Sequence, residues 1–392
     1  MTKILFNKAY IPKQALKYVN DAISRQISGD GFYTKKVHEF IEKTFSVRKV
    51  LMTTSCSSAL DMAGILLDLK DDDEVILPSY TFVSTANPIV MQGAKPVFAD
   101  ILEETLNIDP KDIRRKITAK TKAIFPVHYA GVSCDMDSIT QIAREYNLKV
   151  VEDAAQGVNA KYRNMYLGTI GDIGCYSFHE TKNYSCGEGG AILINTDDQE
   201  LIERAEIIRE KGTNRSKFFR GQVDKYTWVD VGSSFLPSDI LAAILIAQFE
   251  RMDFINSKRR QIYTYYYQSL KFLEIAGLLR LPIIPDQCTS NYHLFYLLLS
   301  SELERDSLMF FLKEKGISAI FHYIPLHTSP MGKKMGYKVG DLPVTEDISK
   351  RLLRLPLYFG LTSSETQYIT SSIYQYFKIN FNNSRYLEKI NG

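Results

Sequence analysis

Lys182 lies in the segment FHETKNYSCGEGG, between a short apolar run and a glycine-rich turn. Other polar groups follow short apolar runs in the same way. Asp153 ends the run LKVVED, and Ser177 lies near the end of IGCYSFH. Ser57 and Ser58 belong to SCSS, which leads into the helix-like segment SSALDMAGILLDL. A nucleophilic lysine, an acid, and hydroxyls at a helix N-terminus can together support covalent carbonyl chemistry beside a bound anion.

These groups match the needs of pyridoxal 5′-phosphate. The aldehyde of that cofactor needs a lysine, its pyridine nitrogen needs an acid, and its phosphate needs hydrogen-bond donors. Phe82, which follows the run EVILPS, can offer an aromatic face to the ring. Taken alone, Lys182 is more often a surface residue, Asp153 a helix cap and Phe82 a core residue. Their conjunction at successive strand ends favours the cofactor.

The elements that must position these groups are short strands alternating with helices. Between residues 49 and 195 the apolar runs are KVLMTT, EVILPS, KPVFAD, KAIFPVHYAG, LKVVED, IGCYSFH and GGAILIN. Helical patterns such as SSALDMAGILLDL and MDSITQIAREYN separate several of them. This alternation predicts an α/β fold with a mainly parallel seven-stranded sheet and helices on both faces. Ligands of such sheets bind at the carboxyl ends of the strands.

The alternation of short apolar runs and helical patterns ends before residue 250, and a different pattern follows. We predict a large α/β domain over residues 1–250 and a smaller C-terminal α+β domain over residues 251–392. The smaller domain is expected to contain a helix in RMDFINSKRRQIYTYYYQSL, a strand in YHLFYLLLS, a helix in DSLMFFLKEKG and a strand in ISAIFHY.

Composition excludes several classes of protein. Of 392 residues, 48 are basic and 45 acidic, so the formal charge of +3 does not indicate binding to nucleic acid or to a membrane surface. The five cysteines form no CxxC pair, so we expect free thiols and no metal site. We find neither a signal peptide nor a run near the roughly 20 apolar residues of a membrane span. We therefore expect a cytoplasmic protein.

Several motifs resemble one family. The segments EDAAQ, SFHETKN followed by GEGG, PSYTFVSTAN, NIDP and AIFPVHYAG resemble the DegT/DnrJ/EryC1/StrS sugar-nucleotide aminotransferases, which have the fold type I architecture of aspartate aminotransferase. The segments GDIGCYSFHETKN, DVGSSFL, FHYIPLH and LLRLPL resemble its dTDP-4-amino-4,6-dideoxygalactose transaminase branch. This resemblance implies transfer of the amino group of L-glutamate to C4 of dTDP-4-dehydro-6-deoxy-D-glucose, for surface-polysaccharide biosynthesis.

The resemblance also implies roles for individual residues. Lys182 binds the cofactor and shuttles a proton, and Asp153 pairs with the pyridine nitrogen. The other implied cofactor contacts are Gln156 near the ring hydroxyl, Phe82 stacked on the ring, and Ser57, Ser58 and Ser177 at the phosphate. Many family members have an asparagine that reaches the phosphate from the other subunit. Ser234 occupies the matching position here, which implies a homodimer with active sites at the interface.

The sugar nucleotide brings a diphosphate, which requires cations. Residues 209–225 include Arg215, Arg220 and Lys225, and we interpret this segment as a mobile loop over the site; a solvated basic face is the alternative. Three further candidates for contacts to the sugar follow the expected strand ISAIFHY, and each histidine has a structural role as its alternative. They are His322, Tyr323 and His327. Glu188 and Cys186 receive no role.

Three alternatives stay open. A C3 aminotransferase acting on a dTDP-3-dehydro-6-deoxy sugar belongs to the same family, but its members tend to carry SFYPxKN where this chain has SFHETKN. A sugar dehydratase of this superfamily has histidine in place of the lysine, so Lys182 argues against it. The third is a catalytically inactive cofactor-binding protein that serves as a regulator or scaffold.

Overall fold

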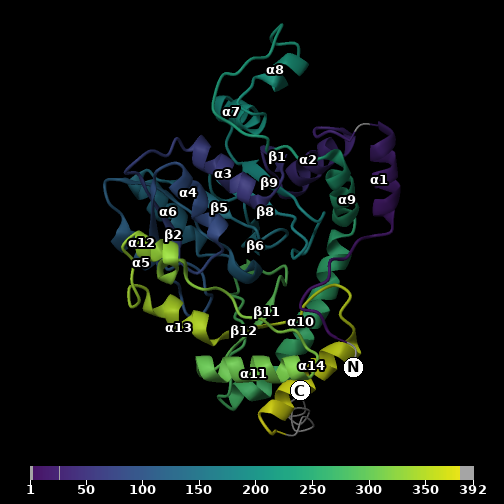
Figure 1. Cartoon of the computed structure of the whole chain (residues 1–392), viewed down its shortest axis with the longest axis vertical. Helices are drawn as coiled ribbons and strands as arrows, with labels where there is room; N and C mark the ends of the chain where they lie inside the picture. The colour runs from purple at the N-terminus through teal and green to yellow at the C-terminus, as the bar shows by residue number, and fades with distance from the viewer. Residues whose placement is uncertain (1–2, 26, 380–392) are drawn as a thin grey trace.

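A seven-stranded sheet forms the centre of the molecule (Figure 1). The computed structural model describes residues 3–25 and 27–379. The strand order is β1-β9-β8-β5-β4-β2-β3, and β9 alone in this sheet runs antiparallel to its neighbours, so the predicted mainly parallel sheet is confirmed. Its strands are β1 (Lys49–Thr53), β2 (Glu74–Pro78), β3 (Lys95–Ala99), β4 (Thr121–Ile124), β5 (Lys149–Asp153), β8 (Ile173–Ser177) and β9 (Gly190–Ile194).

Helices cover both faces of this sheet, because successive strand residues point to opposite sides. In β5, for example, Val150 packs in one apolar cluster and Val151 in the other. The first cluster takes residues from α2 (Phe32–Phe45), α5 (Pro110–Lys116), α6 (Met136–Tyr146) and α9 (Asp239–Phe249). The second takes residues from α3 (Cys56–Leu66), α4 (Asn87–Met91) and α7 (Gln199–Arg209). Helix α1 (Gln14–Arg25) packs along α9.

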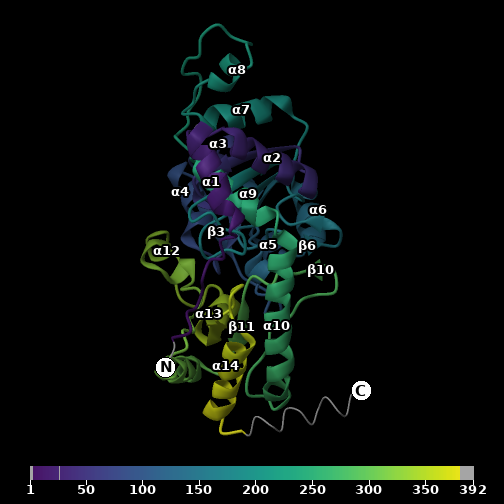
Figure 2. The same ribbon diagram turned by 90° about the vertical axis from the view of Figure 1, so that its right-hand side faces the viewer.

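The C-terminal part has its own apolar cluster. The elements of this C-terminal part are α10 (Met252–Ile275), β11 (Phe295–Leu298), α11 (Glu302–Glu314), α12 (Pro330–Lys334), α13 (Pro343–Arg351), β12 (Leu352–Leu355) and α14 (Ser363–Tyr376). Figure 2 shows the long helix α10 running from the sheet region to this part. Ile4, from the other end of the chain, packs within the same cluster. The domain boundary near residue 250 stays a prediction, and residues 380–392 lie outside the described part.

One predicted strand is wrong. The segment ISAIFHY forms only isolated bridges, between Ile317 and Ile4 and between Ile320 and Arg354. Backbone hydrogen bonds join this segment to Ile4 and to Arg354 at single positions only, so it does not form a ladder with either neighbour.

Short elements complete the described chain. A three-stranded sheet joins the two parts, formed by β6 (Lys161–Tyr162), β7 (Met165–Tyr166) and β10 (Cys288–Thr289). The remaining elements are α8 (Arg215–Phe219) and the 3-10 turns η1 (Val83–Thr85), η2 (Tyr129–Gly131) and η3 (Leu326–Thr328). Among the described helices, none combines the length and the apolar character that a membrane crossing requires.

Candidate active site

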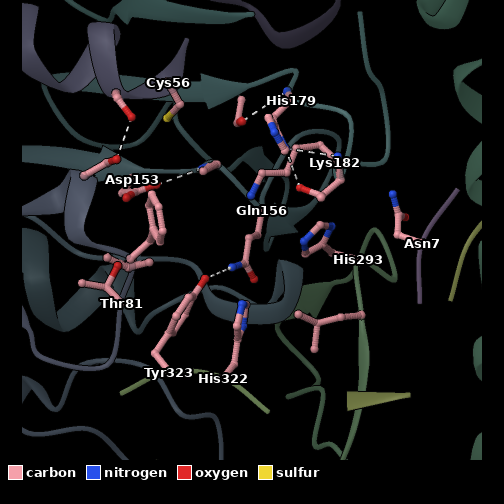
Figure 3. Close-up of a pocket in the computed structure, with 18 of the residues that line it drawn as sticks. Asn7, Cys56, Thr81, Asp153, Gln156, His179, Lys182, His293, His322 and Tyr323 are labelled. Atoms are coloured by element: carbon pink, nitrogen blue, oxygen red, sulfur yellow. Dashed lines mark hydrogen bonds between the residues drawn. The ribbon is translucent and has the colours of Figure 1, made fainter. Parts of the chain in front are cut away.

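A cavity of about 390 Å³ lies at the carboxyl ends of the parallel strands, between the sheet and the C-terminal part (Figure 3). Its walls come from distant segments of the chain. The large part contributes the N-terminus of α3, the ends of β5 and β8, and the turn before β9, while the C-terminal part contributes β12 and residues 320–323. Eight of the residues that we singled out from the sequence line this cavity: Ser57, Phe82, Asp153, Gln156, Ser177, Lys182, His322 and Tyr323.

Lys182 follows β8 in a tight turn, in which its backbone N–H donates to the carbonyl of His179 at 2.9 Å. Figure 3 shows its side chain directed into the cavity. Burial lowers the pKa of Lys182, the Asp153 charge acts against that shift, and the Arg354 charge adds to it. A lysine whose pKa is lowered is more often neutral, and the neutral amine is the form that attacks a carbonyl or accepts a proton.

Asp153 ends β5 and is only 5% exposed. One carboxylate oxygen accepts a hydrogen bond from the Thr85 hydroxyl at 2.7 Å, and the other accepts from the Ala155 N–H at 3.1 Å. Thr85 is itself hydrogen-bonded to Thr81 at 2.8 Å. No basic side chain of the described residues forms an ion pair with Asp153. A buried carboxylate without a cation needs a positive partner from a ligand, and a protonated pyridine nitrogen supplies one.

The N-terminus of α3 lines the cavity opposite the C-terminal part. Ser55 caps this helix, since its hydroxyl accepts from the Ser58 N–H at 3.1 Å. Ser57 faces the cavity and is hydrogen-bonded to Ser84 at 2.6 Å. The Ser58 hydroxyl is instead engaged with Thr54 and Ser55, and Ser58 is not among the cavity-lining residues. The helix start thus offers N–H groups and hydroxyls suited to a phosphate, with Ser57 as the exposed member.

Gly190 explains part of the glycine-rich turn GEGG. A Cβ atom at Gly190 would lie 2.3 Å from the Ser55 carbonyl carbon and 2.4 Å from the Cys56 nitrogen. β9 can therefore approach the start of α3 only because residue 190 is a glycine. Gly187 has a positive φ of 92°, which suits the turn itself. The Cys186 thiol donates to the Glu188 carbonyl at 3.3 Å, so Cys186 has a structural role within this turn.

Gln156, Tyr323 and His322 form a connected wall. The Gln156 side-chain oxygen accepts from the Ala130 N–H at 2.8 Å, and its nitrogen donates to the Tyr323 hydroxyl at 3.1 Å. The rings of His322 and Tyr323 stack at 3.6 Å between centroids. Burial lowers the pKa of His322, so this ring is neutral near neutral pH. Phe82 is 58% exposed and lies at the cavity wall, where a planar ligand can stack on it.

The cavity-lining residues that were not predicted from the sequence include Arg354, His293 and His179. The Nδ1 of His293 donates to the side-chain oxygen of Asn183 at 2.9 Å, and the side-chain nitrogen of Asn183 donates to the Asn291 carbonyl at 2.8 Å. His179 lies 3.5 Å from the Glu188 carboxylate. Proximity to the lysine in SFHETKN could have indicated His179, but nothing local in the sequence marks Arg354 or His293.

His327 is placed differently from our expectation. Its ring is fully buried, with Nδ1 2.7 Å from the Ser79 hydroxyl and Nε2 3.0 Å from the Glu346 carboxylate. Both ring nitrogens are thus occupied within the protein, and His327 does not line the cavity. Its position favours the structural alternative over a contact to the sugar.

The segment 209–225 does not cover the cavity of its own chain, which corrects our expectation. Figure 1 shows α7 and α8 at the opposite end of the molecule from α11 and α14. Arg220 lies 2.6 Å from Glu206, and Arg215 lies 3.6 Å from Glu210. Lys225 is exposed, and Ser234 forms an isolated bridge with Glu210. The basic composition was visible in the sequence, but it carried no information about where the segment lies.

A mainly parallel seven-stranded sheet with a lysine and an unpaired buried acid at its strand ends defines a pyridoxal-phosphate-dependent transferase of fold type I. Within that class, the chain belongs to the DegT/DnrJ/EryC1/StrS aminotransferase family, whose model matches residues 9–374. The resemblance of the motifs to this family is therefore confirmed. The family uses pyridoxal phosphate, and the residues described above fit that cofactor.

Two curated relatives and one solved structure illustrate the similarity. The spore coat polysaccharide biosynthesis protein SpsC of Bacillus subtilis is 35% identical over 86% of this chain and 88% of its own length. A pleiotropic regulatory protein of Geobacillus stearothermophilus is 36% identical over 91% of both chains. A sugar aminotransferase structure, Spr1654 of Streptococcus pneumoniae in its PLP form, superposes with a TM-score of 0.88 at 25% identity, covering 96% of this chain and 98% of that one.

Proposed function

We propose that this chain is a pyridoxal-phosphate-dependent aminotransferase that moves the amino group of L-glutamate to C4 of dTDP-4-dehydro-6-deoxy-D-glucose. The product would be dTDP-4-amino-4,6-dideoxy-D-galactose. The observation that carries the aminotransferase assignment is the shared cavity of Lys182 and Asp153, in which burial lowers the pKa of the amine and none of the described basic side chains forms an ion pair with the acid. The name of the SpsC relative supports a role in surface-polysaccharide biosynthesis.

The residues of the cavity would have different roles in the reaction. Bound pyridoxal phosphate supplies an electron sink that makes the Cα proton of an amino acid acidic. The Lys182 amine would hold the cofactor at its aldehyde and, when free, would accept the Cα proton and return it. Asp153 would keep the ring nitrogen protonated, and its hydrogen bonds from Thr85 and Ala155 fix the orientation of the carboxylate. Ser57 and Ser177 would hold the phosphate at the start of α3.

The wall opposite these groups would orient the substrates. Phe82 would stack on the cofactor ring, and Gln156, which accepts from the Ala130 N–H, would contact the ring hydroxyl. Tyr323 and His322 face the same cavity from the C-terminal part and contact the sugar. Because the His322 ring is neutral, it offers one donor and one acceptor to hydroxyl groups.

We further propose a homodimer in which residues 210–234 of one protomer approach the cavity of its partner. This segment carries exposed apolar side chains that a second copy would cover: Phe219, Tyr226, Trp228, Val229 and Val231. Trp228 is 76% exposed. Such a patch on one segment is typical of an interface between chains. In that arrangement Ser234, Arg215, Arg220 and Lys225 would contribute to the partner's site. The free thiols and the nucleotide-sugar substrate fit a cytoplasmic location.

Product analysis tests the regiochemistry. The holoenzyme is incubated with L-glutamate and dTDP-, UDP- or GDP-linked 4-keto-6-deoxy sugars, and the product is examined by NMR. We expect the dTDP sugar to be preferred and the new amine to be bonded to C4. An amine at C3 of a dTDP-3-dehydro sugar would support the C3 aminotransferase instead. A preference for a UDP or GDP sugar would contradict the nucleotide assignment while leaving the aminotransferase intact.

A further inference from the structure

His293 belongs to the loop that leads into β11, and its side chain lines the cavity together with Lys182. The side chain is buried, and Figure 3 shows its ring at the cavity. The buried Arg259 guanidinium fixes this loop, because it donates to the backbone carbonyls of Tyr292 and His293. The position of the His293 ring is therefore determined by the fold before any ligand binds.

The hydrogen bonds around His293 determine which ring nitrogen carries the proton. The side-chain nitrogen of Asn183 donates to the Asn291 carbonyl at 2.8 Å, so the amide oxygen of Asn183 is the atom that faces the His293 ring. That oxygen lies 2.9 Å from Nδ1 and can only accept, so Nδ1 is the protonated nitrogen. Burial and the charges of Lys182 and Arg259 lower the pKa of the ring well below its ordinary value. The ring is therefore neutral, and Nε2 has no proton.

The Nε2 atom of His293 is a hydrogen-bond acceptor to which none of the described residues donates. Two other buried histidines differ in this respect. His128 has the Glu152 carboxylate 2.8 Å from Nε2 and the Cys134 N–H at Nδ1. His327 likewise has a partner at each ring nitrogen. An acceptor that is held in a cavity without a donor is unfavourable unless a ligand supplies one, so His293 indicates a ligand that donates.

We propose that the Nε2 atom of His293 accepts a hydrogen bond from a ring hydroxyl of the sugar substrate and so selects sugars that carry this hydroxyl. The inference rests on the proposed function, because it requires a ketosugar as the amino acceptor. Carboxylates and phosphates only accept hydrogen bonds, so neither glutamate carboxylates nor the cofactor phosphate can pair with Nε2. A sugar hydroxyl donates, and a site built to bind a hydroxyl rejects analogues that lack it.

The two halves of the reaction separate a sugar contact from other roles of His293. Glutamate bleaches the cofactor absorbance of the holoenzyme and the dTDP-linked 4-ketosugar restores it, so the half-saturating concentration of each is measured separately. In His293→Phe, which fills the space without an acceptor, we expect the value for the ketosugar to rise about 5- to 100-fold, the effect of leaving a hydroxyl unpaired. The value for glutamate should be unchanged. His293→Gln, whose amide oxygen can accept, should recover part of the loss.

Ketosugars that lack one ring hydroxyl identify the donor. For one of these deoxy analogues, wild type should need the same high concentration that His293→Phe needs for the intact sugar, and His293→Phe should not distinguish that analogue from the intact sugar. If every deoxy analogue weakened His293→Phe as much as wild type, His293 would contact none of these hydroxyls and the inference would fail.

Tyr292→Phe is the matched control, because it removes a hydroxyl from the same loop but outside the cavity lining. Both of its half-saturating concentrations should equal those of wild type. An unchanged response of His293→Phe to the ketosugar would overturn the inference, and so would equal losses in both half-reactions, since His293 would then serve Lys182 or the fold. A wild-type protein that glutamate bleaches but no ketosugar restores would instead contradict the proposed function, so the two failures are distinguishable.

Discussion

Two of the cavities in the described part of the chain differ in how their charged side chains are paired. The second cavity, of about 510 Å³, lies between α7, α8 and the start of β1. Four of its five lysine and arginine side chains are matched with acids: Arg209 with Asp30, Lys49 and Arg220 with Glu206, and Arg215 with Glu210. In the strand-end cavity, by contrast, Lys182, Arg354 and Asp153 form no ion pair with any side chain in residues 3–25 and 27–379.

The difference separates charges that serve the fold from charges that serve a ligand. In a buried ion pair, each charge offsets the desolvation cost of the other. Removing one member therefore leaves the other charge buried without a partner. An unpaired charge in a cavity is held in place by the surrounding fold and is complemented only when a ligand binds. We therefore expect substitutions in the two cavities to affect different properties, activity in one and stability in the other.

The largest expected effect is that of Lys182→Ala. Without the amine, neither attachment of the cofactor nor proton transfer at Cα has a group to perform it. We expect turnover to fall by at least about 10⁴-fold, the upper range for losing a positioned proton-transfer group, and the purified protein to be colourless. Steady-state assay and visible absorbance check both. A yellow variant would show that another lysine carries the cofactor.

A smaller loss is expected for Asp153→Asn, which keeps the shape of the side chain and removes its charge. The ring nitrogen then loses the anion that keeps it protonated, and we expect turnover to fall about 10²- to 10³-fold, as when one preorganised electrostatic contact is removed. Thr85→Val, which removes the 2.7 Å hydrogen bond to Asp153 but leaves the charge, should have a milder effect. Equal losses in the two variants would contradict a role for the charge itself.

The free energy of unfolding should respond differently to the loss of the paired Arg209 and to the loss of the unpaired Arg354. Arg209→Met leaves Asp30 without its partner, and we expect unfolding free energy to fall by about 1–3 kcal/mol. Arg354→Met removes a buried charge with no partner, so stability should be unchanged or up to about 1 kcal/mol higher. Denaturant unfolding of the two variants measures the contrast. A marked destabilisation by Arg354→Met would mean that Arg354 serves the fold.

The smallest effects are expected in the pH dependence of cofactor capture. Cofactor-free protein captures pyridoxal phosphate through the neutral Lys182 amine, so the rate falls as pH drops through the pKa of that group. Burial lowers this pKa from its ordinary value of 10.5, so the half-maximal rate should lie below pH 10.5. The Arg354 charge lowers it further and the Asp153 charge raises it. Arg354→Gln should thus move the profile to higher pH and Asp153→Asn to lower pH; the reverse order would contradict this arrangement.

The sequence was sufficient for the sheet and for the core of the site. Each strand of the central sheet is a short apolar run, because central strands are buried on both faces. Lys182 and Asp153 could be identified because they follow such runs together with hydroxyls and an aromatic residue, a conjunction that pyridoxal phosphate requires. The strand ends of a parallel sheet meet at one edge, so local patterns were enough to bring these residues together.

The errors concern groups whose surroundings come from distant parts of the chain. Arg354 is an ordinary strand residue in LLRLPL, and only the tertiary structure shows that its guanidinium lies over the Phe6 ring and pairs with none of the described carboxylates. His327 owes its structural position to Ser79 and Glu346, which no local pattern reveals. The basic character of residues 209–225 was correct as composition, but its nearest acids, Glu206 and Glu210, and its distance from the cavity depend on the tertiary fold.

The measurement that tests the central claim most directly is the visible spectrum of the purified holoenzyme during addition of L-glutamate. We predict that the yellow colour bleaches, that one equivalent of 2-oxoglutarate forms per active site, and that addition of the dTDP-linked 4-ketosugar restores the colour. Lys182→Ala should show none of these changes. A yellow protein whose spectrum does not respond to glutamate would contradict the claim and would favour a cofactor-binding regulator or scaffold.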